Sequence, residues 1–247
     1  MALIHSFEKS GNTLFRYRGQ IPVILFLLAV PVIYYTGDAW LSHPVRLSLT
    51  ILSVFISFLG FLVRAIAIAT TPKGTSGRNR DEQVAESLNT TGIYSVVRHP
   101  LYLGNYLMWI GIVIYTYNFW FVLVVSLLYW LYYERIMFAE ERFLERKFGD
   151  SYMGWANTTP SFVPALKGYR KNVVPFSMKS ILRREYSGVL ATVIGFTFID
   201  DLRRYFGSQT FEWVTTWHMA LIVTVVIAII MRSLKHYTSL LKESDRS

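Results

Sequence analysis

The sequence predicts an all-α protein, a polytopic transmembrane helical domain of about six helices, with five as the alternative. Two observations carry this prediction. Of the 247 residues, 53% are hydrophobic and only 17% are charged, whereas soluble domains carry about a quarter charged residues. The apolar residues also gather in long, nearly charge-free runs, several of which approach the roughly 20 residues that a membrane-spanning helix needs. We expect residues 1–247 to form a single membrane domain.

Each apolar run is expected to form one helix. In chain order the runs are 21–37, 45–70, 101–117, 118–138, 187–199 and 217–231. The fifth run is short, because Asp200 and Asp201 follow it directly, and this shortness is the reason for the alternative of five spans. The second run contains Arg64 near its end; an arginine inside the membrane is a functional candidate, but at this position its long side chain is expected to extend to the lipid headgroups. Residues 1–20 and 71–89 are polar connections.

The basic residues predict the topology. With six spans and both termini in the cytoplasm, 21 of the 25 lysines and arginines lie on the cytoplasmic side and three lie on the other. This bias is what the positive-inside rule requires. The formal net charge of +9 is therefore explained by topology and does not predict a nucleic-acid partner.

The residue inventory excludes several kinds of site. The chain has no cysteine, which excludes disulfides, thiolate metal sites and cysteine nucleophiles. Its five histidines are scattered and predict no metal site.

A helical hairpin focuses attention on two charged clusters. Only residues 116–118 separate the third and fourth runs, so these helices are expected to be antiparallel. Arg98 and His99, before the third helix, should then face Glu140 and Glu141, after the fourth. Carboxylates there could bind an ammonium group, and the N–H groups of the helix start could bind a carboxylate. The alternative is that these glutamates alternate with basic residues on a merely solvated helix.

The same residues carry a resemblance to a known family. Residues 91–104 read TGIYSVVRHPLYLG, and EERFL (140–144) and FGDSY (148–152) follow after the hairpin. This combination resembles the signature of integral-membrane S-adenosylmethionine-dependent methyltransferases, which include isoprenylcysteine carboxyl methyltransferases and phospholipid N-methyltransferases. The resemblance covers residues 86–164. It divides the chain into N-terminal helices with a cytoplasmic loop (1–90), a methyltransferase core (91–164) and C-terminal helices (165–247).

The resemblance implies a cytoplasmic site for S-adenosylmethionine. Carried over position by position, the implied cofactor residues are Leu88, Asn89, Gly92, Tyr94, His99, Pro100, Leu101, Tyr102, Gly104, Glu140 and Glu141. Glu140 corresponds to the residue that holds the methionine ammonium, and Gly104 would let the cofactor approach the helix closely. Ser161 stands where the family frequently has arginine, so Arg135 or Arg142 would have to take over that role.

Methyl transfer is an in-line displacement that requires positioning of the donor and the acceptor. We assign acceptor orientation to Arg98 and Arg135, and a base or ion-pair role to Glu134. The acceptor is expected to be a membrane lipid or a lipid-linked group, with a carboxylate or phosphate oxygen favoured.

Two alternatives to this reading stay open. One is N-methylation of ethanolamine headgroups. The other is a non-enzymatic membrane transporter or assembly protein, in which the same charged residues only pair with one another. The sequence leaves the oligomeric state open.

Overall fold

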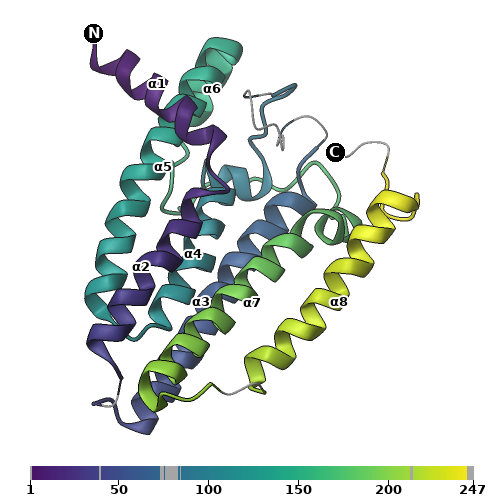
Figure 1. The fold of residues 1–247 in the computed structure, drawn as a ribbon. Coiled ribbons are helices and arrows are strands. Elements are labelled where there is room, and N and C mark those ends of the chain that lie inside the picture. Colours follow the sequence, from purple (N-terminus) through teal and green to yellow (C-terminus); the bar gives the residue numbers. More distant parts are fainter. Residues whose placement is uncertain are drawn as a thin grey trace.

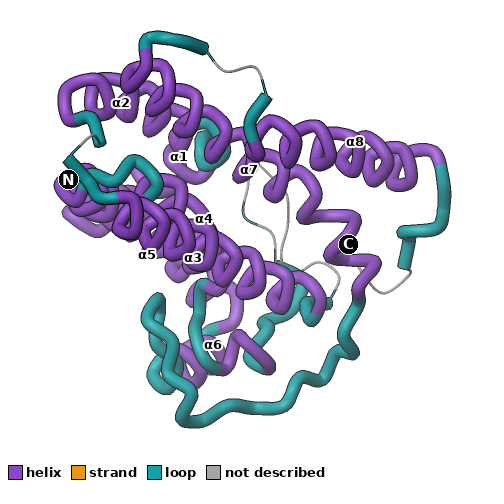
Figure 2. Tube along the Cα trace, turned by 90° about the horizontal axis from the view of Figure 1, so that it is seen from below, coloured by secondary structure: helices purple, strands orange, loops and turns teal. Residues whose placement is uncertain are grey.

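The computed structural model describes residues 2–38, 40–72, 75, 83, 85–211 and 214–243. All regular secondary structure within these ranges is helical, which confirms the predicted all-α class (Figures 1 and 2). Four of the basic residues counted for the topology, Lys73, Arg78, Arg80 and Arg246, lie outside the described ranges.

The six predicted apolar runs fall in six separate helices. The elements in chain order are α1 (Leu3–Arg16), α2 (Ile21–Thr36), α3 (His43–Ala69), η1 (Gly92–Ser95), α4 (Pro100–Ile114), α5 (Phe119–Phe148), α6 (Asp150–Ala156), α7 (Met178–Ser208) and α8 (Thr216–Tyr237). The short fifth run is the middle of α7, which has 31 residues. That helix is about 46 Å long at 1.5 Å per residue, because it continues through the charged residues on both sides of the run.

Three described helices, α3, α5 and α8, are long and apolar enough to cross a membrane, while α4 and residues Phe26–Thr36 of α2 are apolar but shorter. Large apolar side chains on the long helices point outward: Phe55, Leu127 and Ile222 are each more than half exposed. Such surfaces are stable in lipid and costly in water. The chain is therefore an integral membrane protein, and six spans stays a prediction.

The predicted hairpin is formed by α4 and α5. Tyr117 makes the tight turn between them with a positive φ of 58°, and the side chain of Asn118 accepts a hydrogen bond from the Phe121 N–H at 2.8 Å, which caps the start of α5. Gly149, with φ +53°, ends α5. The beginning of α4 and the end of α5 consequently meet at one end of the bundle, together with α1 and α6 (Figure 1). We call this the site end.

Small residues bring α3 and α4 close together. The hydroxyl of Ser57 donates to the Met108 carbonyl at 2.8 Å, and a Cβ on Gly104 would lie 2.8 Å from the Gly60 carbonyl and would clash with the Arg64 side chain. Gly104 thus serves the packing of two helices. Its open side faces Gly60 and Arg64 of α3, and its contact with a cofactor stays a prediction.

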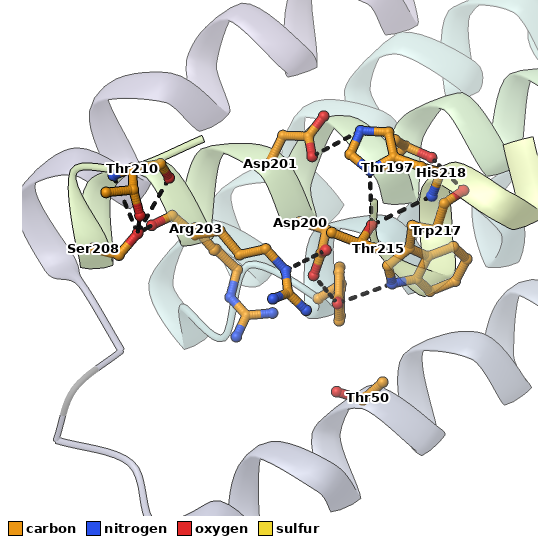
Figure 3. A network of polar contacts seen from close by, with 12 residues as sticks. Thr50, Thr197, Asp200, Asp201, Arg203, Ser208, Thr210, Thr215, Trp217 and His218 are labelled. Carbon is orange, nitrogen blue, oxygen red and sulfur yellow. Dashed lines mark hydrogen bonds and ion pairs between the residues drawn. The ribbon is translucent and has the colours of Figure 1, made fainter. Parts of the chain in front are cut away.

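A polar network closes the opposite end of the bundle (Figure 3). Asp200, buried on α7, accepts hydrogen bonds from the Tyr115 hydroxyl at 2.6 Å and from Arg204 at 2.7 Å. The indole N–H of Trp217 donates to the same Tyr115 hydroxyl at 3.0 Å. This network links α4, α7 and α8, and we call this end the far end.

Candidate active site

A cavity of about 430 Å³ lies at the site end. Its walls come from the start of α4, the last turns of α5, the end of α3, the first half of α7 and residues 85–89. The predicted site residues that line it are Leu88, Asn89, Tyr94, Arg98, His99, Pro100, Leu101, Tyr102 and Glu140. The hairpin thus brings most of the implied cofactor residues to one hollow.

His99 is held between the two predicted glutamates. It is 7% exposed, its Nε2 lies 2.9 Å from Oε1 of Glu141, and its Nδ1 lies 3.5 Å from Oε2 of Glu140. Burial lowers the pKa of His99, but the hydrogen bonds and charges of the two carboxylates outweigh burial and raise the pKa above its ordinary value. The imidazole therefore tends to stay protonated and to link the two helices of the hairpin.

Arg98 is fixed by a carboxylate of α5 and by a carbonyl at the end of α6. Its Nε lies 3.0 Å from Oε1 of Glu141, and its Nη1 donates to the Ala156 carbonyl at the end of α6 at 2.7 Å. The backbone N–H groups of Arg98 and His99 donate to the carbonyls of Pro160 and Ser161 at 2.9 and 3.2 Å. These amides are therefore already used and are not available for a ligand carboxylate.

The two glutamates have different positions. Glu140 lines the cavity with 29% of its side chain exposed. Glu141 lies outside the lining residues, between His99 and Arg98, and forms an ion pair with each of them. Glu140 is therefore placed to contact a ligand, whereas Glu141 positions its neighbours.

Besides Glu141, four predicted site residues do not reach the cavity. The Arg135 guanidinium stacks 3.2 Å from the centre of the Phe7 ring on α1, and neither Arg135 nor Glu134 is among the lining residues. Gly92 and Gly104 are absent from the lining as well. Their assignment to acceptor, base or cofactor contacts is not met by this geometry.

The reasons differ between these residues. Helical periodicity turns positions 134 and 135 away from the cavity face that holds position 140. Gly92 has φ +61°, and a Cβ there would lie 2.7 Å from the Asn172 side chain, so this glycine fits η1 against the loop after α6. Arg142, the other proposed substitute at the Ser161 position, pairs with Glu145 at 2.6 Å and does not line the cavity.

Sequence reasoning missed a buried ion pair at the inner wall of the cavity. Nε and Nη2 of Arg64 donate to the two carboxylate oxygens of Glu185 at 2.8 and 2.6 Å, and Nη1 donates to Asn105 at 2.6 Å. Arg64 therefore turns inward, and the expectation that it extends to the headgroups is wrong. The signal was available, because an arginine inside an apolar run needs a partner and Glu185 precedes the fifth run.

No cluster of three or more potential metal ligands occurs among the residues that the structure describes.

Comparisons with known proteins agree with this architecture. A family model described as phospholipid methyltransferase matches residues 42–151. The chain is 32% identical over 133 residues to a protein-S-isoprenylcysteine O-methyltransferase of Schizosaccharomyces pombe, covering 51% of this chain and 56% of that protein. It is 33% identical over 150 residues to the cobalt-zinc-cadmium resistance protein CzcN of Cupriavidus metallidurans, covering 60% of this chain and 63% of that protein.

A more distant relative is the protein-S-isoprenylcysteine O-methyltransferase of Tribolium castaneum, at 26% identity over 132 residues, 53% of this chain and 44% of that protein. The chain spans less than two thirds of the length of each of these three relatives. No solved structure matches.

Residues 42–151, fewer than half of the chain, match the phospholipid methyltransferase family model, and together with the isoprenylcysteine O-methyltransferase relatives this match supports the integral-membrane methyltransferase superfamily. Helices α7 and α8 lie outside the family match.

Proposed function

We propose that the protein transfers a methyl group from S-adenosylmethionine to a carboxylate or phosphate oxygen of a lipid or lipid-linked acceptor at the cytoplasmic face of a membrane. The observation that carries the proposal is the cavity at the open end of the hairpin, where Glu140 and His99 line one wall within the segment that matches the phospholipid methyltransferase family. The named relatives that are O-methyltransferases of isoprenylcysteine support an oxygen acceptor.

The residues present fit the cofactor. Glu140 offers a carboxylate to an ammonium group. Nδ2 of Asn89 is buried at the cavity and has no hydrogen-bond partner among the described residues, so a ligand acceptor atom such as a purine nitrogen would satisfy it. Tyr94 and Tyr102 add aromatic surface for an adenine or methionine group.

When bound, S-adenosylmethionine supplies an activated methyl group on a sulfonium sulfur. The residues of this chain bind and orient the methyl donor and the acceptor, and they exclude water from the site. His99 and Glu141 fix the geometry of Glu140, and the buried walls keep the reacting atoms away from bulk solvent. Transfer to a carboxylate or phosphate oxygen breaks the S–C bond and forms a C–O bond, and no proton has to be removed.

Electrostatics of the lining favour an anionic acceptor over an amine. Four arginines line the cavity, Arg18, Arg64, Arg98 and Arg184, against Glu140 and Glu185. Arg64 pairs with Glu185 and Arg98 with Glu141, while Arg18 and Arg184 have further interactions within the chain. A carboxylate or phosphate acceptor is attracted by the arginines of the lining, whereas an ethanolamine ammonium is repelled by them. An ethanolamine would also need a base to remove its proton.

Two measurements test the proposal. Calorimetric titration of the detergent-purified protein with S-adenosylhomocysteine should show binding that the Glu140→Gln variant weakens by about tenfold, since a charge-assisted hydrogen bond contributes about 1.5–3 kcal/mol. Glu145→Gln on the same helix, which removes a carboxylate 37% exposed and outside the cavity lining, is the matched control. Absence of binding to well-folded wild type overturns the proposal.

The second measurement identifies the acceptor atom. Incubation with methyl-labelled S-adenosylmethionine and membrane lipid extract should yield label that is released as methanol by base when the product is a methyl ester. A label that resists base and stays with ethanolamine lipids would instead establish N-methylation.

A further inference from the structure

We propose that Arg64, held by Glu185 and Asn105, is the group that binds the oxyanion of the methyl acceptor, a lipid-borne carboxylate or phosphate. The proposal rests on the proposed function and names the acceptor subsite of the same cavity. Arg64 contacts the acceptor, while Glu185 and Asn105 position it.

The first argument is the geometry of the cluster. Arg64 on α3, Asn105 on α4 and Glu185 on α7 all line the cavity. Glu185 is 2% exposed and accepts from two guanidinium nitrogens of Arg64, at 2.8 and 2.6 Å. A two-point grip of this kind fixes the plane of the guanidinium group. The guanidinium is therefore presented to the cavity in one orientation.

The second argument counts donors. A guanidinium group carries five N–H donors and cannot be deprotonated in a protein. Glu185 and Asn105 take three of them, one on Nε, one on Nη1 and one on Nη2. Among the described residues this leaves one N–H on Nη1 and one on Nη2 for a ligand, and the Arg64 side chain is 19% exposed at the cavity wall. N–H groups on both terminal nitrogens can donate to the oxygens of a carboxylate or phosphate.

The third argument is depth. His99 lies just before Pro100, the first residue of α4, and Asn105 lies five residues after Pro100. Asn105 is therefore about 8 Å further along the helix. The cluster and the Glu140–His99 pair therefore occupy different levels of one cavity. A lipid-linked acceptor bound at the inner level and a water-soluble cofactor bound at the outer level would meet between them, as an in-line transfer requires.

The fourth argument is the cost of the arrangement. A buried ion pair seldom stabilises a membrane helix bundle more than apolar packing of the same volume does. This pair also demands glycine at position 104, because a Cβ there would clash with the Arg64 side chain. A cavity-facing charge with such demands is better explained by a ligand than by packing.

The test compares charged ligands with uncharged ligands of the same lipid chain, on the wild type and on a double variant. The full-length protein in detergent, saturated with S-adenosylhomocysteine, is titrated with N-acetyl-S-farnesylcysteine and with its carboxamide, which has the same lipid chain and no carboxylate. The Arg64→Gln/Glu185→Gln double variant removes both charges and keeps a neutral hydrogen-bonded pair of similar shape, so no buried charge is left alone. A parallel titration with phosphatidic acid and its uncharged diacylglycerol distinguishes a phosphate from a carboxylate acceptor.

The matched control is the far-end pair Arg203 and Asp38, changed to Gln and Asn. Nη2 of Arg203 lies 2.5 Å from Oδ2 of Asp38, and the two side chains are 12% and 19% exposed. This ion pair is therefore also partly buried, like the Arg64–Glu185 pair, but it lies at the far end (Figure 3 shows Arg203). Thermal unfolding and S-adenosylhomocysteine binding are measured for every variant.

We expect the wild type to bind one of the two charged ligands at least about tenfold more tightly than the uncharged ligand with the same lipid chain. A difference of this size corresponds to the free energy of one charge-assisted hydrogen bond. The double variant should lose this preference and keep S-adenosylhomocysteine affinity within about twofold, while the control keeps both. A preference that persists in the double variant, or a wild type without one, overturns the proposal. Failure of wild type to bind S-adenosylhomocysteine is a separate result that overturns the proposed function.

Discussion

His99 and Glu141, 42 positions apart in the sequence, lie 2.9 Å apart across the open end of the hairpin. The contact joins the residue just before α4 to the last turns of α5, and Glu141 also lies 3.0 Å from Arg98. The cavity wall that contains Glu140 therefore depends on the ionic contacts of Glu141 with His99 and Arg98, which we call the charged clasp.

Protonation of His99 should make this clasp pH-dependent. The two carboxylates raise the pKa of His99 in the folded protein despite its burial, and the unfolded value is near 6.5. A group whose folded pKa is raised stabilises the fold fully below the unfolded pKa, and this contribution is lost as the pH rises through the folded pKa. The difference in melting temperature between wild type and His99→Gln should therefore shrink from pH 6 towards pH 9. A difference that stays constant or grows contradicts this assignment.

Replacement of Glu141 should weaken cofactor binding indirectly. Glu141→Gln leaves His99 and Arg98 with a neutral partner, so the orientation of Glu140 is less well fixed. We expect an affinity for S-adenosylhomocysteine lowered by a few fold, less than for Glu140→Gln, because one positioning contact contributes about 1 kcal/mol. Titration calorimetry measures both. A loss larger than that of Glu140→Gln would place Glu141 in direct contact with the ligand.

The meeting of these residues could be predicted from the sequence, because it depends on chain connectivity. Two apolar runs with almost nothing between them must form an antiparallel pair, so the residues before the first run and after the second share one end. The apolar runs could be recognised in the sequence because a helix that crosses a lipid bilayer needs a long segment almost without charged residues.

The inner wall of the cavity could not be predicted in this way. Arg64 and Glu185 are 121 positions apart, and their contact depends on which faces of α3 and α7 pack together. An arginine near a helix end fits a headgroup contact as well as an inward pair by its position alone. The contact of Gly104 with Gly60 and Arg64 also depends on how α3 packs against α4 and could not be predicted from the sequence.

Substitution of Gly104 should destabilise the bundle. In Gly104→Ala the new Cβ would clash with Arg64 and lie 2.8 Å from the Gly60 carbonyl, which forces α3 and α4 apart. Overpacking of this kind costs about 1–3 kcal/mol. Thermal unfolding in detergent should show a lower melting temperature. Gly154→Ala on α6, where a Cβ meets nothing within 4 Å, is the control and should not be destabilised. Equal melting temperatures for wild type and Gly104→Ala would refute the close packing.

The far-end network should affect stability without affecting the site. Tyr115→Phe removes a hydroxyl that donates to Asp200 at 2.6 Å and accepts from Trp217 at 3.0 Å. The loss of partners for a buried carboxylate costs about 1–3 kcal/mol. We expect a lower melting temperature and unchanged affinity for S-adenosylhomocysteine. Tyr237→Phe, at a side chain 88% exposed, should change neither. An altered affinity in Tyr115→Phe would show that the two ends are coupled.

The orientation in the membrane can be tested directly because the chain contains no cysteine. The charge bias predicts that the site end faces the cytoplasm and the far end faces the opposite side. Gly207, at the far end of α7, has open space around a new Cβ, and Ser239 lies exposed just after α8 at the site end. A membrane-impermeant maleimide should label Gly207→Cys in intact cells, and should label Ser239→Cys only after permeabilisation. The reverse pattern would place the cavity on the outer face, where S-adenosylmethionine from the cytoplasm could not reach it, and the proposed cofactor would have to be abandoned.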